Sequence, residues 1–112
     1  MSIAGDLIRG HTDAIILARL MRGDSYGYEI NKTISTLSSG RFELKEATLY
    51  TAFKRLEETG CIASYWGDSG AGARRRYYTI TAAGRQVYLR LLSEWSETKD
   101  IMDKLMEVGE TL

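Results

Sequence analysis

The chain has 112 residues, which is enough for one domain and too few for two. Basic and acidic side chains number 15 each and hydrophobic residues make up 44%, the balance of an ordinary globular protein. The single cysteine and the single histidine exclude an internal disulfide, multi-cysteine metal sites and histidine-pair zinc sites. The sequence shows neither a signal peptide nor an apolar run of membrane-spanning length, so we expect a cytoplasmic protein that does not enter a membrane.

The neutral total conceals two parts of opposite charge. Residues 1–91 contain 13 basic and 9 acidic side chains, whereas residues 92–112 contain 2 basic and 6 acidic ones. A basic body favours a partner that carries phosphate, although uneven decoration of a solvated surface explains the same counts.

Two helices are predicted at the start of the chain. The first covers residues 7–22, where apolar side chains recur at helical spacing, and Gly23 is expected to end it. The second is expected to begin at a cap formed by Asp24 or Ser25 and to end at residues 38–40.

A third helix is predicted over residues 46–60, with Leu49, Phe53 and Leu56 on its core face. The opposite face carries hydroxyl and basic groups that suit contacts to base edges and phosphates, namely Thr48, Tyr50, Thr51, Lys54 and Arg55. An ordinary amphipathic helix with solvated basic residues would show the same pattern, so both interpretations stay open.

A β-hairpin is predicted next, with strands over residues 62–66 and 76–80 and a flexible glycine-rich loop over residues 67–73. Arg74, Arg75 and Arg76 follow one another at the second strand, so their side chains must alternate between its two faces. An anionic partner would relieve their mutual repulsion; protection of an edge strand from aggregation is the structural alternative. Of Tyr77 and Tyr78, we expect one to pack in the core and the other to brace the hairpin.

The last helix is predicted over residues 82–108, with Thr81 as its cap. Two mainly apolar stripes follow heptad spacing along it, which predicts a two-fold homodimer through this helix. Three helices and a hairpin form the winged helix-turn-helix arrangement, with the third helix for recognition and the hairpin as wing. We therefore predict a mainly α fold with a small β-hairpin: a winged helix-turn-helix domain over residues 1–81 and one long C-terminal dimerisation helix over residues 82–112.

Trp95 lies midway along the last helix, within one apolar stripe. Plain packing in a dimer core is one interpretation. In the other, Trp95 and its symmetry mate enclose a cavity for a flat apolar or cationic ligand. The first helix would help to line that cavity with Leu7, Gly10, Asp13, Ala14 and Leu17.

Five segments, in this order, resemble the PadR family of bacterial transcription regulators: GYEI at 27–30, EATLYTAFKRLE at 46–57, SYWG at 64–67, RRRYY at 74–78 and TAAG at 81–84. The resemblance implies a homodimeric winged-helix repressor of double-stranded DNA. The single C-terminal helix is similar to that of the short subfamily, which includes a lactococcal multidrug-binding regulator with a pair of tryptophans beside a drug-binding pore. The resemblance implies such a pore here, lined by Leu7, Gly10, Asp13, Ala14, Leu17, Leu92, Trp95, Ser96, Lys99 and Met102.

The favoured hypothesis is a dimeric repressor that binds a palindromic operator with half-sites about 34 Å apart. A planar hydrophobic ligand at the dimer interface would release it. Two alternatives are a winged-helix DNA-binding protein without a small-molecule effector and a protein–protein adaptor. The sequence shows no nucleophile–base pair, paired acids or metal-ligand spacing, so neither an enzyme nor a cofactor is expected.

Overall fold

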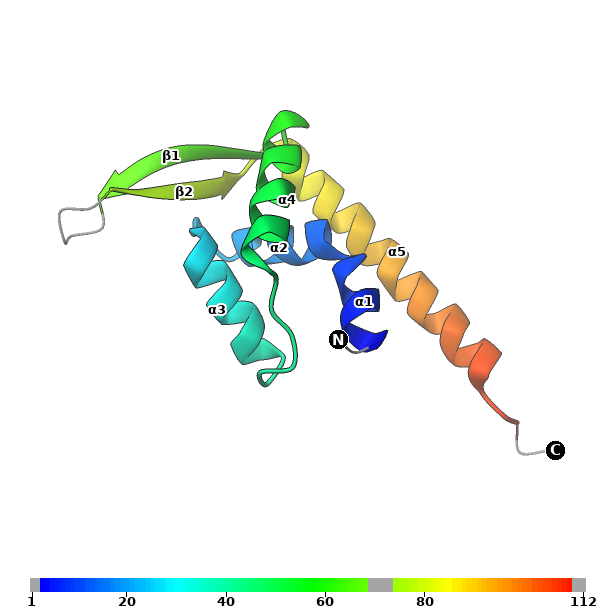
Figure 1. Cartoon of the computed structure of the whole chain (residues 1–112). Coiled ribbons are helices and arrows are strands. Elements are labelled where there is room, and N and C mark those ends of the chain that lie inside the picture. The colour runs from blue at the N-terminus through cyan, green and yellow to red at the C-terminus, as the bar shows by residue number, and fades with distance from the viewer. Residues whose placement is uncertain (1–2, 69–73, 110–112) are drawn as a thin grey trace.

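The computed structural model describes residues 3–68 and 74–109, which form five helices and one β-hairpin (Figure 1). The elements in chain order are α1 (Ile3–Arg9), α2 (Thr12–Met21), α3 (Gly27–Leu37), α4 (Glu46–Glu58), β1 (Ile62–Asp68), β2 (Arg74–Ile80) and α5 (Ala82–Met106). The hairpin of β1 and β2 projects from one side of the helices and α5 from the other. The predicted mainly helical fold, with a small hairpin and a long last helix, is confirmed.

The predicted first helix is wrong in one respect, because the structure divides it into α1 and α2 at Gly10 and His11. The N–H of Gly10 donates to the carbonyl of Leu7, and the N–H of His11 donates to the carbonyl of Ile8. Both bonds reach back three residues rather than four, so they tighten the last turn of α1 and end it. Glycine has a low helix propensity, which makes position 10 a natural place for the break.

The start of α3 also differs from the prediction. Its N-cap is Tyr26, which makes no side-chain capping bond, and the Ser25 hydroxyl donates instead to the Glu29 carboxylate. Asn31 then holds the loop that leads to α4: its amide donates to the carbonyl of Leu44 at 2.7 Å and accepts from the N–H of Leu44 at 2.8 Å. This pair of bonds fixes α4 relative to α3, the relation on which a helix-turn-helix depends.

The hairpin is longer than predicted, because Gly67 and Asp68 belong to β1 rather than to the loop. Antiparallel pairing runs from Ile62 opposite Ile80 to Asp68 opposite Arg74. The predicted loop residues 69–73 lie outside the described part of the chain. At the base of the hairpin, Tyr78 exchanges two backbone hydrogen bonds with Ser25, which fastens β2 to the segment before α3.

The start of α5 is as predicted, since the Thr81 hydroxyl accepts from the N–H of Gly84 at 3.0 Å. Gly84 is buried against the turn before β1. A Cβ at this position would lie 2.0 Å from the carbonyl oxygen of Cys61, so only glycine fits. The helix ends at Met106, two residues before the predicted end.

One hydrophobic core joins α2, α3, α4 and the hairpin, and its most completely buried side chains are Ile16, Leu17, Leu20, Ile30, Leu44 and Phe53. The predicted core face of α4 is confirmed, because Leu49, Phe53 and Leu56 are all buried. Among the described residues, no helix combines the length and apolar character needed to cross a membrane.

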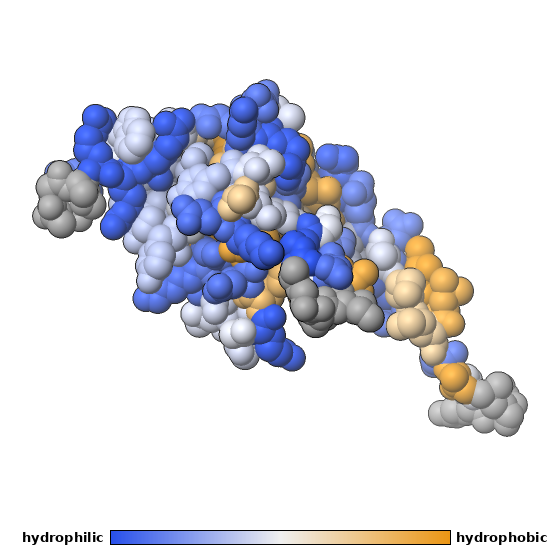
Figure 2. Space-filling view, in the orientation of Figure 1, coloured by the Kyte–Doolittle hydropathy of each residue, from blue (hydrophilic) through white to orange (hydrophobic). Residues whose placement is uncertain are grey.

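The first turns of α5 pack on this core, but the described residues from 92 to 109 are all exposed. Several of them are large and apolar: Leu92, Trp95, Ile101, Met102, Leu105, Met106 and Val108. Figure 2 shows hydrophobic side chains gathered on the distal part of α5, while the visible face of the hairpin is hydrophilic.

Candidate nucleic-acid interface and the adjoining cavity

The outward face of α4 carries the side chains predicted for it. Thr51, Lys54 and Arg55 are exposed, and Thr48 is half-buried. The helix begins after Lys45, which makes no side-chain capping bond to the first N–H groups. Lys45 and Thr48 lie beside this helix start, and Glu46 places an acidic side chain in its first turn.

Tyr50 is less free than its place on this face indicates. Its ring packs edge-to-face on Phe53, with 5.6 Å between the ring centroids. Its hydroxyl lies so close to the start of α3 that a Cβ at Gly27 would approach it to 2.7 Å. Gly27 therefore makes room for Tyr50, whose remaining exposed surface, 46%, faces outward.

The three wing arginines alternate between the faces of β2, as predicted. The guanidinium carbons of Arg74 and Arg76 lie 5.4 and 5.5 Å from the Trp66 ring centroid on one face. On the other face, the guanidinium carbon of Arg75 lies 4.1 Å from the centroid of the Tyr26 ring. Cation–π attraction restricts these long side chains, and the guanidinium groups keep their charge for an anion.

Neither aromatic partner was predicted from the sequence. Trp66 lies opposite Arg76 in the hairpin register, so pairing the two predicted strands would have placed them together. No comparable signal pointed to Tyr26, because it reaches the wing through the fold and not through the strand register.

A polar network ties the wing to α4. The Ser64 hydroxyl donates to the Glu57 carboxylate at 2.6 Å and accepts from the Arg76 guanidinium at 2.6 Å. Arg76 also forms a longer ion pair with Glu57, at 3.8 Å. Arg76 therefore has a structural role besides any contact with a partner.

A second attachment holds the opposite face of the wing. The Tyr65 hydroxyl donates to the Asp24 carboxylate at 2.7 Å. Side-chain hydrogen bonds from Thr79 and then from Tyr65 lower the pKa of Asp24 below its ordinary value, because they favour the charged carboxylate. The same bond to Asp24 raises the pKa of Tyr65.

The two adjacent tyrosines divide their roles as predicted. Tyr78 is buried and stacks on Phe53 with 3.9 Å between ring centroids, and burial raises the pKa of its hydroxyl. Tyr77 stacks on Tyr65 across the hairpin, at 5.6 Å, and braces it.

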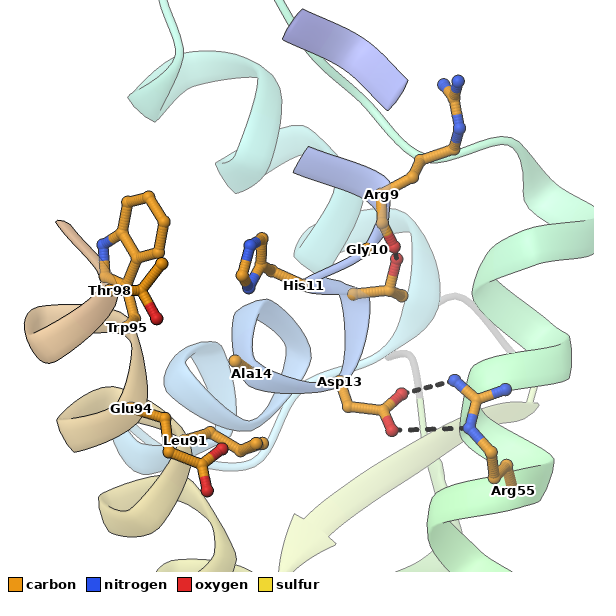
Figure 3. Close-up of a pocket in the computed structure, with 11 residues that line it drawn as sticks. Arg9, Gly10, His11, Asp13, Ala14, Arg55, Leu91, Glu94, Trp95 and Thr98 are labelled. Atoms are coloured by element: carbon orange, nitrogen blue, oxygen red, sulfur yellow. Dashed lines mark hydrogen bonds and ion pairs between the residues drawn. The ribbon is translucent and has the colours of Figure 1, made fainter. Parts of the chain in front are cut away.

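A cavity of about 430 Å³ lies between α5 and the junction of α1 with α2 (Figure 3). Trp95 lies on the α5 side and meets His11 edge-to-face, with 5.0 Å between ring centroids. Glu94 adds a carboxylate from α5, and Asp13 adds another from α2.

This cavity gathers only some of the residues predicted to line a ligand site: Gly10, Asp13, Ala14 and Trp95. Leu17 has no exposed surface, because it is packed in the core. Leu92 and Ser96 line a separate shallow groove along α5. Leu7, Lys99 and Met102 are exposed and line neither of these two hollows. His11 also lines the cavity, although it was not among the predicted lining residues. Its place four residues after Leu7 and three before Ala14 is the helical spacing that could have pointed to it.

Arg55 and Asp13, which were predicted for different sites, form one ion pair. The Arg55 guanidinium donates two hydrogen bonds to the Asp13 carboxylate, as Figure 3 shows. Hydrogen bonding to Asp13 raises the pKa of Arg55. Arg55 also lines a second groove, of about 370 Å³, between α4 and the junction of α1 with α2, together with Thr48 and Thr51.

Residues 16–90 match the model of the Transcriptional regulator PadR-like family. A relative from Lysinibacillus sphaericus, described as uncharacterized protein X, is 46% identical over 105 residues, which cover 94% of this chain and 96% of the relative. The structure of a transcriptional regulator from Clostridium thermocellum is 45% identical with a TM-score of 0.85 and covers 95% of this chain and 100% of its own. The structure of a PadR family transcription regulator from Clostridium difficile is 35% identical with a TM-score of 0.75. It covers 87% of this chain and 99% of its own.

The family match includes α3, α4, the hairpin and the start of α5, which are the elements that form the candidate interface. PadR family regulators bind DNA, typically as dimers, and are not enzymes. The chain belongs to the PadR-like family of transcriptional regulators.

Proposed function

We propose that the protein is a homodimeric transcriptional repressor that binds a palindromic operator in double-stranded DNA. The observation that carries this proposal is the placement of an exposed, partly basic face of α4 beside a wing whose three arginines lie over aromatic rings. The proposed DNA contacts are Thr48, Tyr50, Thr51, Lys54 and Arg55 on α4 and Arg74, Arg75 and Arg76 on the wing.

The two elements have different roles in this proposal. The wing arginines and Lys54 neutralise phosphates, which provides affinity for any sequence. Thr48, Tyr50 and Thr51 lie toward the start of α4, the part of a recognition helix that reaches base edges in the major groove, so they select the sequence.

The exposed apolar side chains of α5 support the homodimer. Monomeric proteins rarely leave so many large apolar side chains exposed together on one protruding helix. A second copy packed along α5 would cover them and would present two recognition helices to one duplex. In this arrangement residues 1–81 bind DNA and residues 82–112 dimerise.

The effector is proposed to be a planar hydrophobic molecule that stacks on Trp95 at the dimer interface. The proposed site comprises Leu7, Gly10, Asp13, Ala14, Leu92, Trp95, Ser96, Lys99 and Met102, whereas Leu17 is packed in the core and has no exposed surface for a ligand. A ligand can release DNA only if it binds unequally to dimers with different spacings of α4.

The test of DNA binding is fluorescence anisotropy with the DNA upstream of the protein's own gene and with a random duplex. We expect tighter binding to the upstream DNA and an affinity that falls steeply with salt. Changing Arg75 and Arg76 together to Ala should weaken both duplexes and reduce the salt slope by about two. The control changes Arg85 and Arg90 on α5 to Ala, which removes the same charge away from the wing. Equal affinity for both duplexes with a flat salt dependence would contradict the proposal.

The ligand is tested by tryptophan fluorescence with planar dyes. Saturable quenching in the wild type that disappears in Trp95→Ala supports the proposed site. Because Trp66 also fluoresces, quenching that persists in this variant would place the dye elsewhere.

A further inference from the structure

Arg55 lies between two surfaces for which different roles are proposed. Arg55, on α4, lines both the cavity beside Trp95 and the groove between α4 and α2, which also contains Thr48 and Thr51. In the structure this guanidinium is bound by Asp13, which belongs to the wall of the cavity. One ion pair therefore separates the proposed DNA face from the proposed effector site.

The Arg55–Asp13 pair is suited to exchange partners. Half of the Arg55 side chain and 36% of the Asp13 side chain are exposed, and an ion pair so open to water is weakly held. The two Arg55 donors bound to Asp13 cannot also bind a phosphate, and the carboxylate offsets the positive charge that would attract one. DNA phosphate and Asp13 therefore compete for Arg55.

We propose that Asp13 withholds Arg55 from DNA, and that an aromatic cation in the cavity beside Trp95 takes the place of Arg55 on Asp13 and so tightens DNA binding. This inference rests on the proposed function, because it concerns the regulation of the same site. The cation would stack on Trp95 and would be neutralised by Asp13, both of which line the cavity.

The proposal fixes the direction in which cation binding and DNA binding affect each other. By linkage, a cation that favours the state with Arg55 released must also bind more tightly when DNA is present. A neutral planar ligand has no charge to offer Asp13, so it leaves the pair intact and acts only on the spacing of the two α4 helices.

The test compares Asp13→Asn with Glu94→Gln by fluorescence anisotropy on the upstream DNA across a salt series. Both variants remove one negative charge from the same cavity, but only Asp13 is bonded to Arg55. We expect Asp13→Asn to tighten DNA binding about threefold to tenfold and to steepen the salt slope by about one, the signature of one added phosphate contact. Glu94→Gln should leave the slope unchanged. In an Arg55→Met background, Asp13→Asn should have no effect, and equal slopes for the two single variants would overturn the proposal.

A second experiment tests the effector with the aromatic cation 2-naphthylmethylammonium and uses the neutral 2-naphthalenemethanol as its matched control. The ammonium should quench Trp95 and tighten DNA binding in the wild type, and it should not tighten binding in Asp13→Asn. Failure to quench Trp95, or quenching without tighter DNA binding, would overturn the proposal.

Failure of this inference can be told apart from failure of the proposed function. If the Arg75 and Arg76 variant weakens DNA binding as expected while Asp13→Asn behaves like Glu94→Gln, only the role of Asp13 is wrong. If the wild type shows no preference for the upstream DNA, both the repressor and the coupling are rejected.

Discussion

Single residues of the wing show how much local geometry follows from sequence. The alternation of Arg74, Arg75 and Arg76 between two faces follows from the two-residue period of a strand, and the structure confirms it. The division of roles between the two tyrosines was also predictable, because a hairpin on a small core has one face to bury. The sequence did not predict the aromatic rings beneath the arginines. Cation–π contacts with these rings restrict the charged side chains of the wing.

We expect Trp66→Leu to weaken binding to all DNA sequences by about twofold to tenfold, since two exposed cation–π contacts of about 0.5–1 kcal/mol each restrict Arg74 and Arg76. The measurement is anisotropy on specific and random duplexes. Trp66→Phe keeps a ring and should retain most of the affinity. A loss confined to the specific duplex would show instead that Trp66 takes part in reading sequence.

We expect Asp24 to make the stability of the protein depend on pH. Because hydrogen bonds from Thr79 and Tyr65 lower its folded pKa, its contribution to stability is present above the unfolded pKa of about 4 and is lost as the pH falls through the folded value. Screening of this exposed group limits the effect to under about 1 kcal/mol. Chemical unfolding of the wild type and Asp24→Asn should therefore differ at pH 7 and converge toward pH 3. A difference that persists unchanged at pH 3 would assign the effect to packing.

At the scale of elements, the sequence predicted which helices and strands exist better than where they end. Periodicity located α3, α4, the hairpin and α5, because each buries a face on a common core. It did not reveal the break at Gly10 and His11, because Leu7 and Ala14 keep a seven-residue spacing across the polar residues 9–13 and the bonds that end α1 are made by the backbone. That one break decides the shape of the cavity beside Trp95.

The start of α5 is the most constrained junction between elements. In Gly84→Ala the new Cβ would overlap the carbonyl oxygen of Cys61, which is backbone and cannot rotate away. We expect a loss of about 2–4 kcal/mol in the free energy of unfolding, measured by urea denaturation. Ala83→Ser, one residue earlier on the exposed side of the same turn, should change stability by less than about 0.5 kcal/mol. Similar values for the two variants would show that α5 can shift to accept a side chain.

Across the whole molecule, the candidate site depends on contacts that no local pattern contains. The residues of the proposed DNA face could be grouped from the sequence because they lie on one helix and one hairpin, whose periods sort residues by face. The Arg55–Asp13 pair joins residues 42 positions apart, on elements that meet only in the folded chain. Only some of the residues predicted to line the ligand site lie around one cavity. Leu17 packs in the core, and the distal residues of α5 have no described neighbour with which to form a wall.

At the scale of the assembled protein, we predict that the distal half of α5 holds the dimer together. Ile101 and Leu105 are exposed and lie on the apolar side of this helix, so Glu at both positions would place charge in a dimer contact. We expect this variant to sediment as a monomer at concentrations where the wild type is a dimer, and to bind operator DNA at least about 100-fold more weakly, because two linked recognition helices bind far better than one. The matched control, Gln86→Glu with Ser93→Glu, changes charge by the same amount at exposed positions outside both apolar stripes and should stay dimeric. A wild-type protein that sediments as a monomer at micromolar concentration, or a monomeric variant that keeps full operator affinity, would mean that α5 does not join the two DNA-binding units.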